Sequence, residues 1–165
     1  MYSLLFIGAL IAANLSVAMF GPWVSPINAF LLIGLDLSIR DKLHDKWNGN
    51  PYRIGLLIII AGIVSYLLNP SSGIIAIASV SAFCFSMAID SFVYQSLKNR
   101  KWVVRSNLSN IAGAATDSLI FPTIAFGGLI WEIVLLQFLS KVAGGFIWCH
   151  LINRSQKNAV SESIR

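Results

Sequence analysis

Apolar residues of this chain run in six long blocks that short polar segments separate. The blocks cover residues 2–20, 23–39, 54–68, 74–97, 107–126 and 129–152. A helix of about 20 apolar residues crosses a hydrocarbon core of about 30 Å, whereas a soluble helix shows only a narrow apolar stripe. The pattern therefore predicts an all-α integral membrane protein, folded as one compact bundle of six transmembrane helices.

Composition limits what else the chain can contain. It has 165 residues, of which 56% are hydrophobic and 12% are charged, so six spans leave no room for a separate soluble domain and residues 1–165 are one domain. The net charge of +5 comes from basic clusters beside apolar blocks, without the interleaved aromatic residues of a nucleic-acid surface. The expected surroundings are a lipid bilayer, and no nucleic-acid partner is predicted.

The basic residues also predict the orientation. Four Lys or Arg residues lie between spans two and three, four between spans four and five, and three after span six. The positive-inside rule then places both basic loops and both termini in the cytoplasm, in a multi-pass protein of the cytoplasmic (inner) membrane. The neutral turns near Pro22, Pro70 and Gly127 are expected outside.

Two charged residues interrupt the last two apolar blocks. Asp117 lies in span five and Lys141 in span six, and each costs about 2.5 to 3.5 kcal/mol in the centre of a membrane helix. A rise of 1.5 Å per residue brings both close to the midplane. Asn14 and Asp36 reach a similar depth, whereas Asp90 lies deeper toward the cytoplasm. These depths predict a polar cluster in the middle of the bundle.

The two helices of this hairpin each carry a polar face. Asn110 and Asp117 recur on one face of span five, and Gln137 and Lys141 on one face of span six. Pro122 cannot donate to the backbone carbonyl one turn before it, which frees that carbonyl beside the polar face. Two such faces can enclose a polar cavity.

Structural interpretations of the same charges fit the spacing equally well. Asp117 and Lys141 are also typical of a salt bridge that fixes two helices, and Asp36 and Arg40 of an ion pair at a helix end. The other acidic residues of the blocks are typical of a membrane interface as well: Asp90 and Glu132.

No catalytic or metal-binding motif occurs in the sequence. It has no phosphate-binding glycine loop, no Ser/His/Asp order and no paired His or Cys residues, so the chain is predicted to be no enzyme and to use no cofactor or metal. Transport by such a chain would depend on a gradient, on trapping of the product, or on an energising partner. The small-residue face of the first span is either plain helix packing or the docking surface of that partner: Ala9, Ala12, Ala13 and Ser16.

Four stretches make the sequence recognisable. They are FLLIGLDLSIRDKL, IAIASVSAFCFSMAIDSFVYQSLKNRKW, NLSNIAGAATDSLIFPTIAF and WEIVLLQFLSKVAGG. In this order they extend from residue 30 to residue 145 of the chain, which resembles the putative vitamin uptake transporter family. The resemblance implies import of queuosine precursors, chiefly 7-cyano-7-deazaguanine. It also implies an architecture similar to the six-helix substrate-binding subunits of energy-coupling-factor importers.

The implied substrate suggests a role for each polar residue. A deazaguanine presents an N–H and an exocyclic amine side by side, which one carboxylate can accept together. The expected substrate-binding residues are Asp117 or Glu132 for that pair, Lys141, Asn110 and Gln137 for the ring carbonyl, Trp131 and Phe121 for stacking, and Asn14 and Asp36 beside them. The candidates for coupling or gating are Asp90, Asp36 and Pro122.

Three hypotheses of function follow. The first is a carrier for a deazapurine that works by alternating access around the midplane cluster. The second is a substrate-capturing subunit that needs a separate energising complex. The third is a non-transporting membrane scaffold whose buried charges only fix the helix register.

Overall fold

The computed structural model describes residues 2–163, and all regular structure in that range is helical. The long elements are α1 (Tyr2–Phe20), α3 (Gly34–Lys46), α4 (Pro51–Leu68), α5 (Gly73–Ser96), α6 (Trp102–Ala125) and α7 (Trp131–Ser163). Short elements precede two of them: η1 (Pro22–Val24), α2 (Ser25–Asn28) and the π-helical η2 (Ala29–Ile33) before α3, and η3 (Pro70–Ser72) before α5. The predicted all-α bundle of six helices is confirmed.

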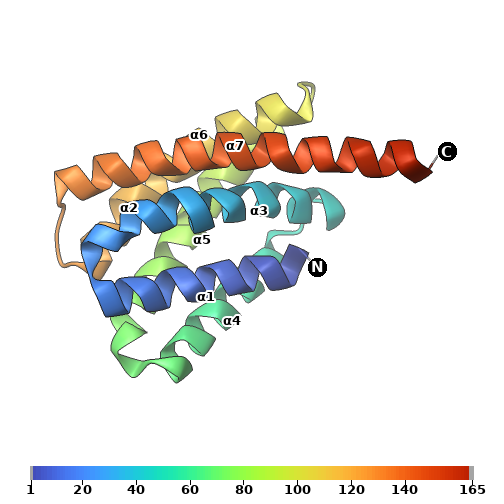
Figure 1. Cartoon of the computed structure of the whole chain (residues 1–165). Coiled ribbons are helices and arrows are strands. Elements are labelled where there is room, and N and C mark those ends of the chain that lie inside the picture. The colour runs from blue at the N-terminus through green and yellow to red at the C-terminus, as the bar shows by residue number, and fades with distance from the viewer. Residues whose placement is uncertain (1, 164–165) are drawn as a thin grey trace.

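The helices pack side by side, and α1 begins at the end of the molecule where α7 ends (Figure 1). α7 lies along α3 and α6, while α1 packs on α4 and α5 packs on both α4 and α6. The loops between α3 and α4 and between α5 and α6 also lie at the end where α1 begins. We call this the basic end, because Lys46, Lys98, Arg100 and Lys101 lie in or beside these loops.

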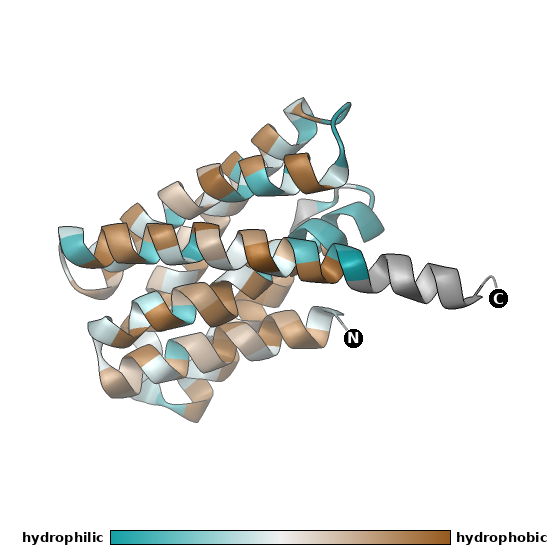
Figure 2. Ribbon diagram, turned by 45° about the horizontal axis from the view of Figure 1, so that its top comes forward, coloured by the Kyte–Doolittle hydropathy of each residue, from teal (hydrophilic) through white to brown (hydrophobic). Residues whose placement is uncertain are grey.

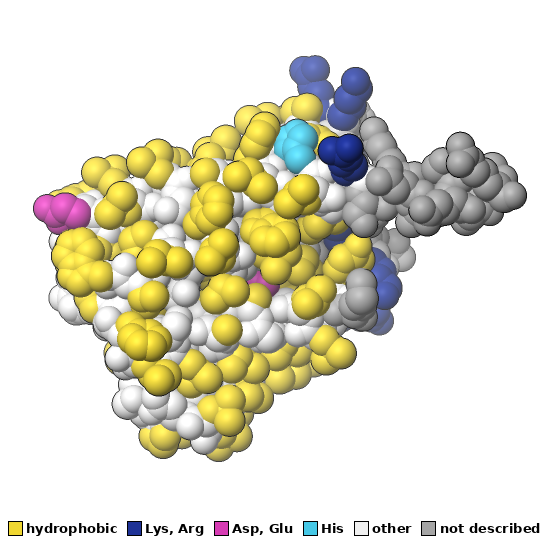
Figure 3. Space-filling view, in the orientation of Figure 1, with side chains coloured by type: hydrophobic (Ala, Val, Ile, Leu, Met, Phe, Trp, Pro, Cys, Tyr) yellow, Lys and Arg dark blue, Asp and Glu magenta, His cyan; other side chains and the backbone are white. Residues whose placement is uncertain are grey.

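The outer surface suits a lipid environment. Hydrophobic side chains cover the face drawn in Figure 3, and Lys and Arg gather at one end of it. Hydropathy colours repeat this division, with hydrophilic positions concentrated in the loops of the basic end (Figure 2). By length and composition four helices can cross a membrane: Tyr2–Phe20, Pro22–Lys46, Pro70–Ser96 and Trp131–Arg154. α4 is apolar but shorter.

Turn residues fix most helix boundaries near the predicted positions. Asn50 caps α4 by accepting a hydrogen bond from the Tyr52 backbone, and Asn69 caps the turn η3 in the same way. Gly21 ends the first helix region with a φ of 79°, a conformation that favours glycine. Four helices extend beyond the predicted apolar blocks. The helix of the second block continues to Lys46, that of the third begins at Pro51, that of the fifth begins at Trp102, and that of the sixth continues to Ser163.

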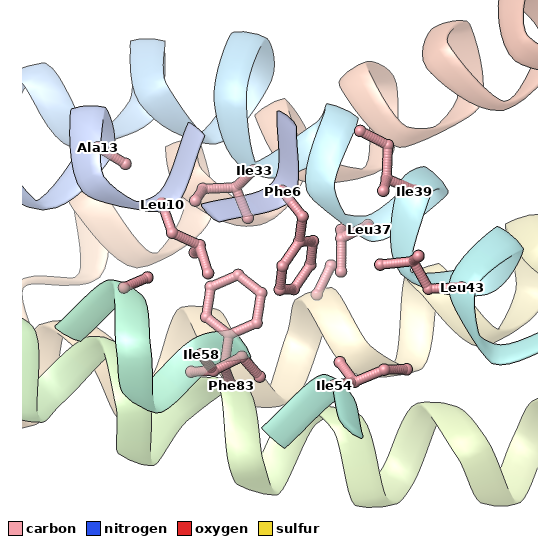
Figure 4. Close-up of a cluster of buried hydrophobic side chains, with 12 residues drawn as sticks. Phe6, Leu10, Ala13, Ile33, Leu37, Ile39, Leu43, Ile54, Ile58 and Phe83 are labelled. Atoms are coloured by element: carbon pink, nitrogen blue, oxygen red, sulfur yellow. The ribbon is translucent and has the colours of Figure 1, made fainter. Parts of the chain in front are cut away.

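An apolar core joins α1, α3, α4 and α5 (Figure 4). Phe6 and Phe83 meet edge to face with ring centroids 6.4 Å apart, and Leu37 and Leu43 of α3 are buried in the same cluster. Such packing fills the space between these helices, whereas the buried charged side chains come from α3, α5, α6 and α7.

Candidate functional site

A buried ion pair joins the last two helices. Lys141 Nζ lies 2.5 Å from Asp117 Oδ2, and the side chains are only 2% and 7% exposed. The ammonium also donates to the hydroxyl of Ser118 at 3.1 Å and to the side-chain oxygen of Gln137 at 2.9 Å. Three acceptors therefore use the three donors of the lysine, as a buried cation requires.

The ion pair continues into a chain of hydrogen bonds toward the end opposite the basic one. The amide nitrogen of Gln137 donates to the hydroxyl of Ser25 at 2.9 Å, and that hydroxyl donates to the carbonyl of Pro22 at 2.5 Å. The turn after α1 is thereby tied to α7. The turn after α1 is therefore linked through Ser25 and Gln137 to the ion pair.

A small cavity lies beside these groups. Five predicted residues line it, contributed by α1, α6 and α7: Asn14, Asp117, Phe121, Gln137 and Lys141. Its volume is about 30 Å³, which is room for about one water molecule. The site is therefore small and largely buried, and both polar and apolar side chains line it.

Two asparagines hold the wall that α1 and α2 provide. Asn14 donates to the hydroxyl of Ser65 on α4 at 3.2 Å. Asn28 donates to the carbonyl of Ala13 at 3.3 Å and to the hydroxyl of Ser16 at 2.6 Å. With their amides engaged in helix packing, both asparagines can still present their side-chain oxygens to the cavity.

The small-residue face of the first helix packs mostly inside the bundle. Ala9 and Ala13 are buried, and Ser16 bonds Asn28, whereas Ala12 is exposed. These contacts are those of plain helix packing. Docking of a partner on this face stays a prediction, with Ala12 as its exposed member.

A second buried ion pair lies nearer the basic end. Arg40 Nη2 is 3.0 Å from Asp90 Oδ1, with side chains 1% and 6% exposed, and Arg40 Nη1 donates to the hydroxyl of Ser86 at 3.4 Å. The expected pair between Asp36 and Arg40 does not form. Sequence spacing favoured a partner on the same helix, but a partner on α5 takes the guanidinium instead.

Asp36 is fully buried, and neither of its carboxylate oxygens has a hydrogen-bond partner. It does not line the cavity, although Ile33, one turn before it, does. Asp36 therefore lies between the cavity and the Arg40–Asp90 pair.

The remaining predicted residues lie apart from the cavity. Asn110 donates to the hydroxyl of Ser106 at 3.5 Å, and that hydroxyl donates to buried Asp41, which places Asn110 in the polar layer near the basic end. Glu132 and Trp131 are exposed at the opposite end, where α7 begins. Only one of the two candidate carboxylates, Asp117, thus reaches the cavity.

Sequence reasoning missed several groups of this site. Ser25, Asn28, Ser79 and Phe83 also line the cavity, and Ser118 binds Lys141. Ser79 and Phe83 are four residues apart on α5, a spacing that puts them on one helix face. That pairing was a usable signal, but an isolated serine in an apolar helix is too common to single out.

Six packed helices with an apolar outer surface and a buried ion pair beside a small cavity define a multi-pass membrane protein. The family model described as putative vitamin uptake transporter matches residues 4–152, so the chain belongs to this family. It is accordingly a membrane transporter. No curated protein and no solved structure matches the chain.

Proposed function

We propose that this transporter imports a queuosine precursor, 7-cyano-7-deazaguanine or a similar deazapurine, through the central cavity. The observation that carries the proposal is the buried Asp117–Lys141 pair, which opens onto a polar cavity together with Gln137. A carboxylate and an ammonium side by side, inside a membrane protein, are costly and are typical of substrate pathways.

The chemistry of the cavity suits a flat, hydrogen-bonding ring. Asp117 can accept the ring N–H and the exocyclic amine together, as a carboxylate accepts a forked donor. Lys141 and the amide of Gln137 can donate to the ring carbonyl. Phe121 lines the same cavity and offers an aromatic face for stacking. Contacts to the substrate then replace part of the contact between Asp117 and Lys141.

Transport requires the site to open, because a cavity of about 30 Å³ is several times too small for a bicyclic base. Two irregular segments flank it. η2 is π-helical and contributes Ala29 and Ile33 to the lining, and Pro122 lies inside α6 one turn after Ser118. Both segments have weakened helical hydrogen bonding and are suitable hinges for alternating access.

The orientation we propose has both termini in the cytoplasm and the protein in the cytoplasmic membrane. Lys46, Lys98, Arg100 and Lys101 lie in or beside the loops of the basic end, which the positive-inside rule assigns to the cytoplasm. The cavity then faces the outside through the turn near Pro22 and the cell interior through the polar layer near Arg40.

Uptake of labelled 7-cyano-7-deazaguanine into proteoliposomes that contain only this chain tests the proposal. Wild-type protein should take up the label, Asp117→Asn should not, and Glu132→Gln should behave as wild type because Glu132 lies outside the cavity. Both variants replace an acid by its own amide, so each removes a charge without changing the size of its side chain. Normal uptake by Asp117→Asn would contradict a direct role of this carboxylate.

The same assay separates the other hypotheses. A substrate-capturing subunit would bind the ligand without transporting it unless its energising complex were added. A scaffold would neither transport nor gain thermal stability from any deazapurine, since only a ligand of the folded state raises the melting temperature. If the chain is a carrier and no enzyme, the labelled substrate inside the proteoliposomes should be chemically unchanged.

A further inference from the structure

The carboxyl group of Asp36 is buried without a polar partner. It is 0% exposed, and both oxygens lack a hydrogen-bond partner. Burial of a carboxylate in that setting is far more costly than burial of the neutral acid, so such a group is either paired or takes up a proton. Asp117 and Asp90 are ion-paired, and buried Asp41 accepts a hydrogen bond from Ser106. Among the buried carboxyl groups of the described residues, Asp36 is the one with neither kind of partner.

Charged groups on the surrounding elements are engaged elsewhere. α1 contains no charged residue, and α5 contains only Asp90, which Arg40 holds. Other described charges near α3 have their own contacts: Lys141 with Asp117, Asp41 with Ser106, Asp45 with Tyr94, Lys42 with Trp102, Arg53 with Trp47, and Arg105 and His44 with Tyr94. Three more are exposed: Lys46, Glu132 and His150.

Among the described residues, Arg40 is the cation at helix-neighbour spacing from Asp36. It follows Asp36 by four residues, so the two side chains share a face of α3 about 6 Å apart along the axis. The guanidinium points to Asp90 and Ser86 instead, while its Nε atom is buried without a partner. One arginine thus lies between two carboxyl groups and pairs with one of them.

We propose that Asp36 is a proton-binding site, and that Arg40 exchanges between Asp90 and Asp36 as the proton is released. In the state described here Arg40 pairs with Asp90, and Asp36 holds the proton. In the other state Arg40 pairs with ionised Asp36, and Asp90 holds the proton. The site binds H⁺ as its ligand.

The exchange balances in charge and protons. Arg40 keeps its positive charge throughout, because a guanidinium does not deprotonate in proteins. One O–H bond breaks at Asp36 and one forms at Asp90, so the three groups carry one acidic proton and no net charge in both states. An uncompensated charge inside the membrane is avoided at each stage.

The positions give this transfer a direction. Asp36 is one turn from Ile33, which lines the cavity, whereas Asp90 is six residues from the end of α5 at the basic end. A proton that passes from Asp36 to Asp90 therefore moves away from the cavity toward the basic end. Coupling of this step to substrate movement rests on the proposed function, but the proton site itself does not.

Infrared difference spectroscopy of the purified protein tests the site without any substrate. At neutral pH the wild-type spectrum should contain the C=O stretching band of a protonated carboxyl group, shifted in D₂O, and this band should vanish in Asp36→Asn. If wild-type protein and Asp36→Asn give identical spectra, the proposal is overturned. The wild-type measurement needs no variant, so an absent band overturns it even where Asp36→Asn fails to fold.

A second variant tests the exchange of the arginine. Asp90→Asn releases Arg40, which should then pair with Asp36 and ionise it. The Asp36 band should therefore disappear although Asp36 is still present. Persistence of the band in a folded Asp90→Asn protein would overturn the exchange.

Uptake in proteoliposomes then separates this inference from the proposed function. If wild-type protein transports the deazapurine, an inward proton gradient should accelerate uptake, and Asp36→Asn should lose this acceleration while still exchanging labelled for unlabelled substrate. Transport without any effect of the gradient would overturn the coupling. If wild-type protein transports no deazapurine, the proposed function fails, and the infrared band alone decides the proton site.

Discussion

Gly34 of α3 and Gly144 of α7 pack backbone against backbone. A Cβ atom built on Gly34 would lie 2.8 Å from the Cα atom of Gly144, and one built on Gly144 would overlap the carbonyl oxygen of Phe30. Small residues allow helices in membranes to approach this closely. The contact presses the π-helical segment η2, which lines the cavity, against the helix that carries Lys141.

Substitution of Gly144 should therefore destabilise the bundle. Gly144→Ala places a methyl group against backbone atoms that cannot rotate away. We therefore expect the free energy of unfolding to fall by about 1–3 kcal/mol, the range for an overfilled core. Thermal unfolding in detergent measures the effect. Gly8→Ala is the matched control, because no atom lies within 4 Å of a Cβ at Gly8. Equal melting temperatures of the two variants would show that the helices can separate at no cost.

The Asp117–Lys141 pair can be tested for structure and function separately. Removal of one partner leaves a buried charge, so Asp117→Leu or Lys141→Met alone should cost about 3–5 kcal/mol. The double variant replaces the pair by apolar groups and should recover most of that stability. Uptake should be lost in all three proteins. A double variant that folds and still transports would reduce the pair to a structural salt bridge.

Phe121 and Trp131 were both predicted to stack on the substrate, and the structure separates them. Phe121 lines the cavity, whereas Trp131 is 58% exposed at the start of α7. Aromatic stacking on a base is worth about 1–3 kcal/mol, so Phe121→Ala should weaken deazapurine binding about 5- to 150-fold. Ligand-dependent thermal shifts of the two alanine variants give the comparison. If Trp131→Ala binds the deazapurine more weakly than Phe121→Ala, the binding site lies at the start of α7 instead.

The depth of a residue in the membrane could be predicted from its position along a helix. Residues at the same depth lie together in the structure, as Asp117 and Lys141 do. Asp117 and Lys141 were expected at one level because each helix rises 1.5 Å per residue from a known end. Asn110 shares a face with Asp117, but seven residues separate them by about 10 Å along the axis. A common face therefore did not bring Asn110 to the same cavity.

Pairing between distant segments could not be predicted in this way. The second predicted span ends at residue 39, just before Arg40 and Asp41, yet both residues are buried in α3. Their partners are Asp90 on α5 and Ser106 on α6, which come 50 and 65 residues later. Local hydropathy ends the span where charged residues become frequent. The folded chain continues the helix, because an ion pair compensates the charge of Arg40 and a hydrogen bond serves Asp41.

Labelling of single cysteines from outside intact cells tests the proposed orientation. In a background without Cys84 and Cys149, Ser71→Cys introduces a thiol in the exposed turn η3, and Asn99→Cys one in the exposed loop between α5 and α6. A membrane-impermeant maleimide should label Ser71→Cys directly and Asn99→Cys only after lysis, because the Lys and Arg residues around Asn99 favour the cytoplasmic side. The reverse result would show that the bundle has the opposite orientation in the membrane, with the polar layer at Arg40 and Asp90 toward the outside.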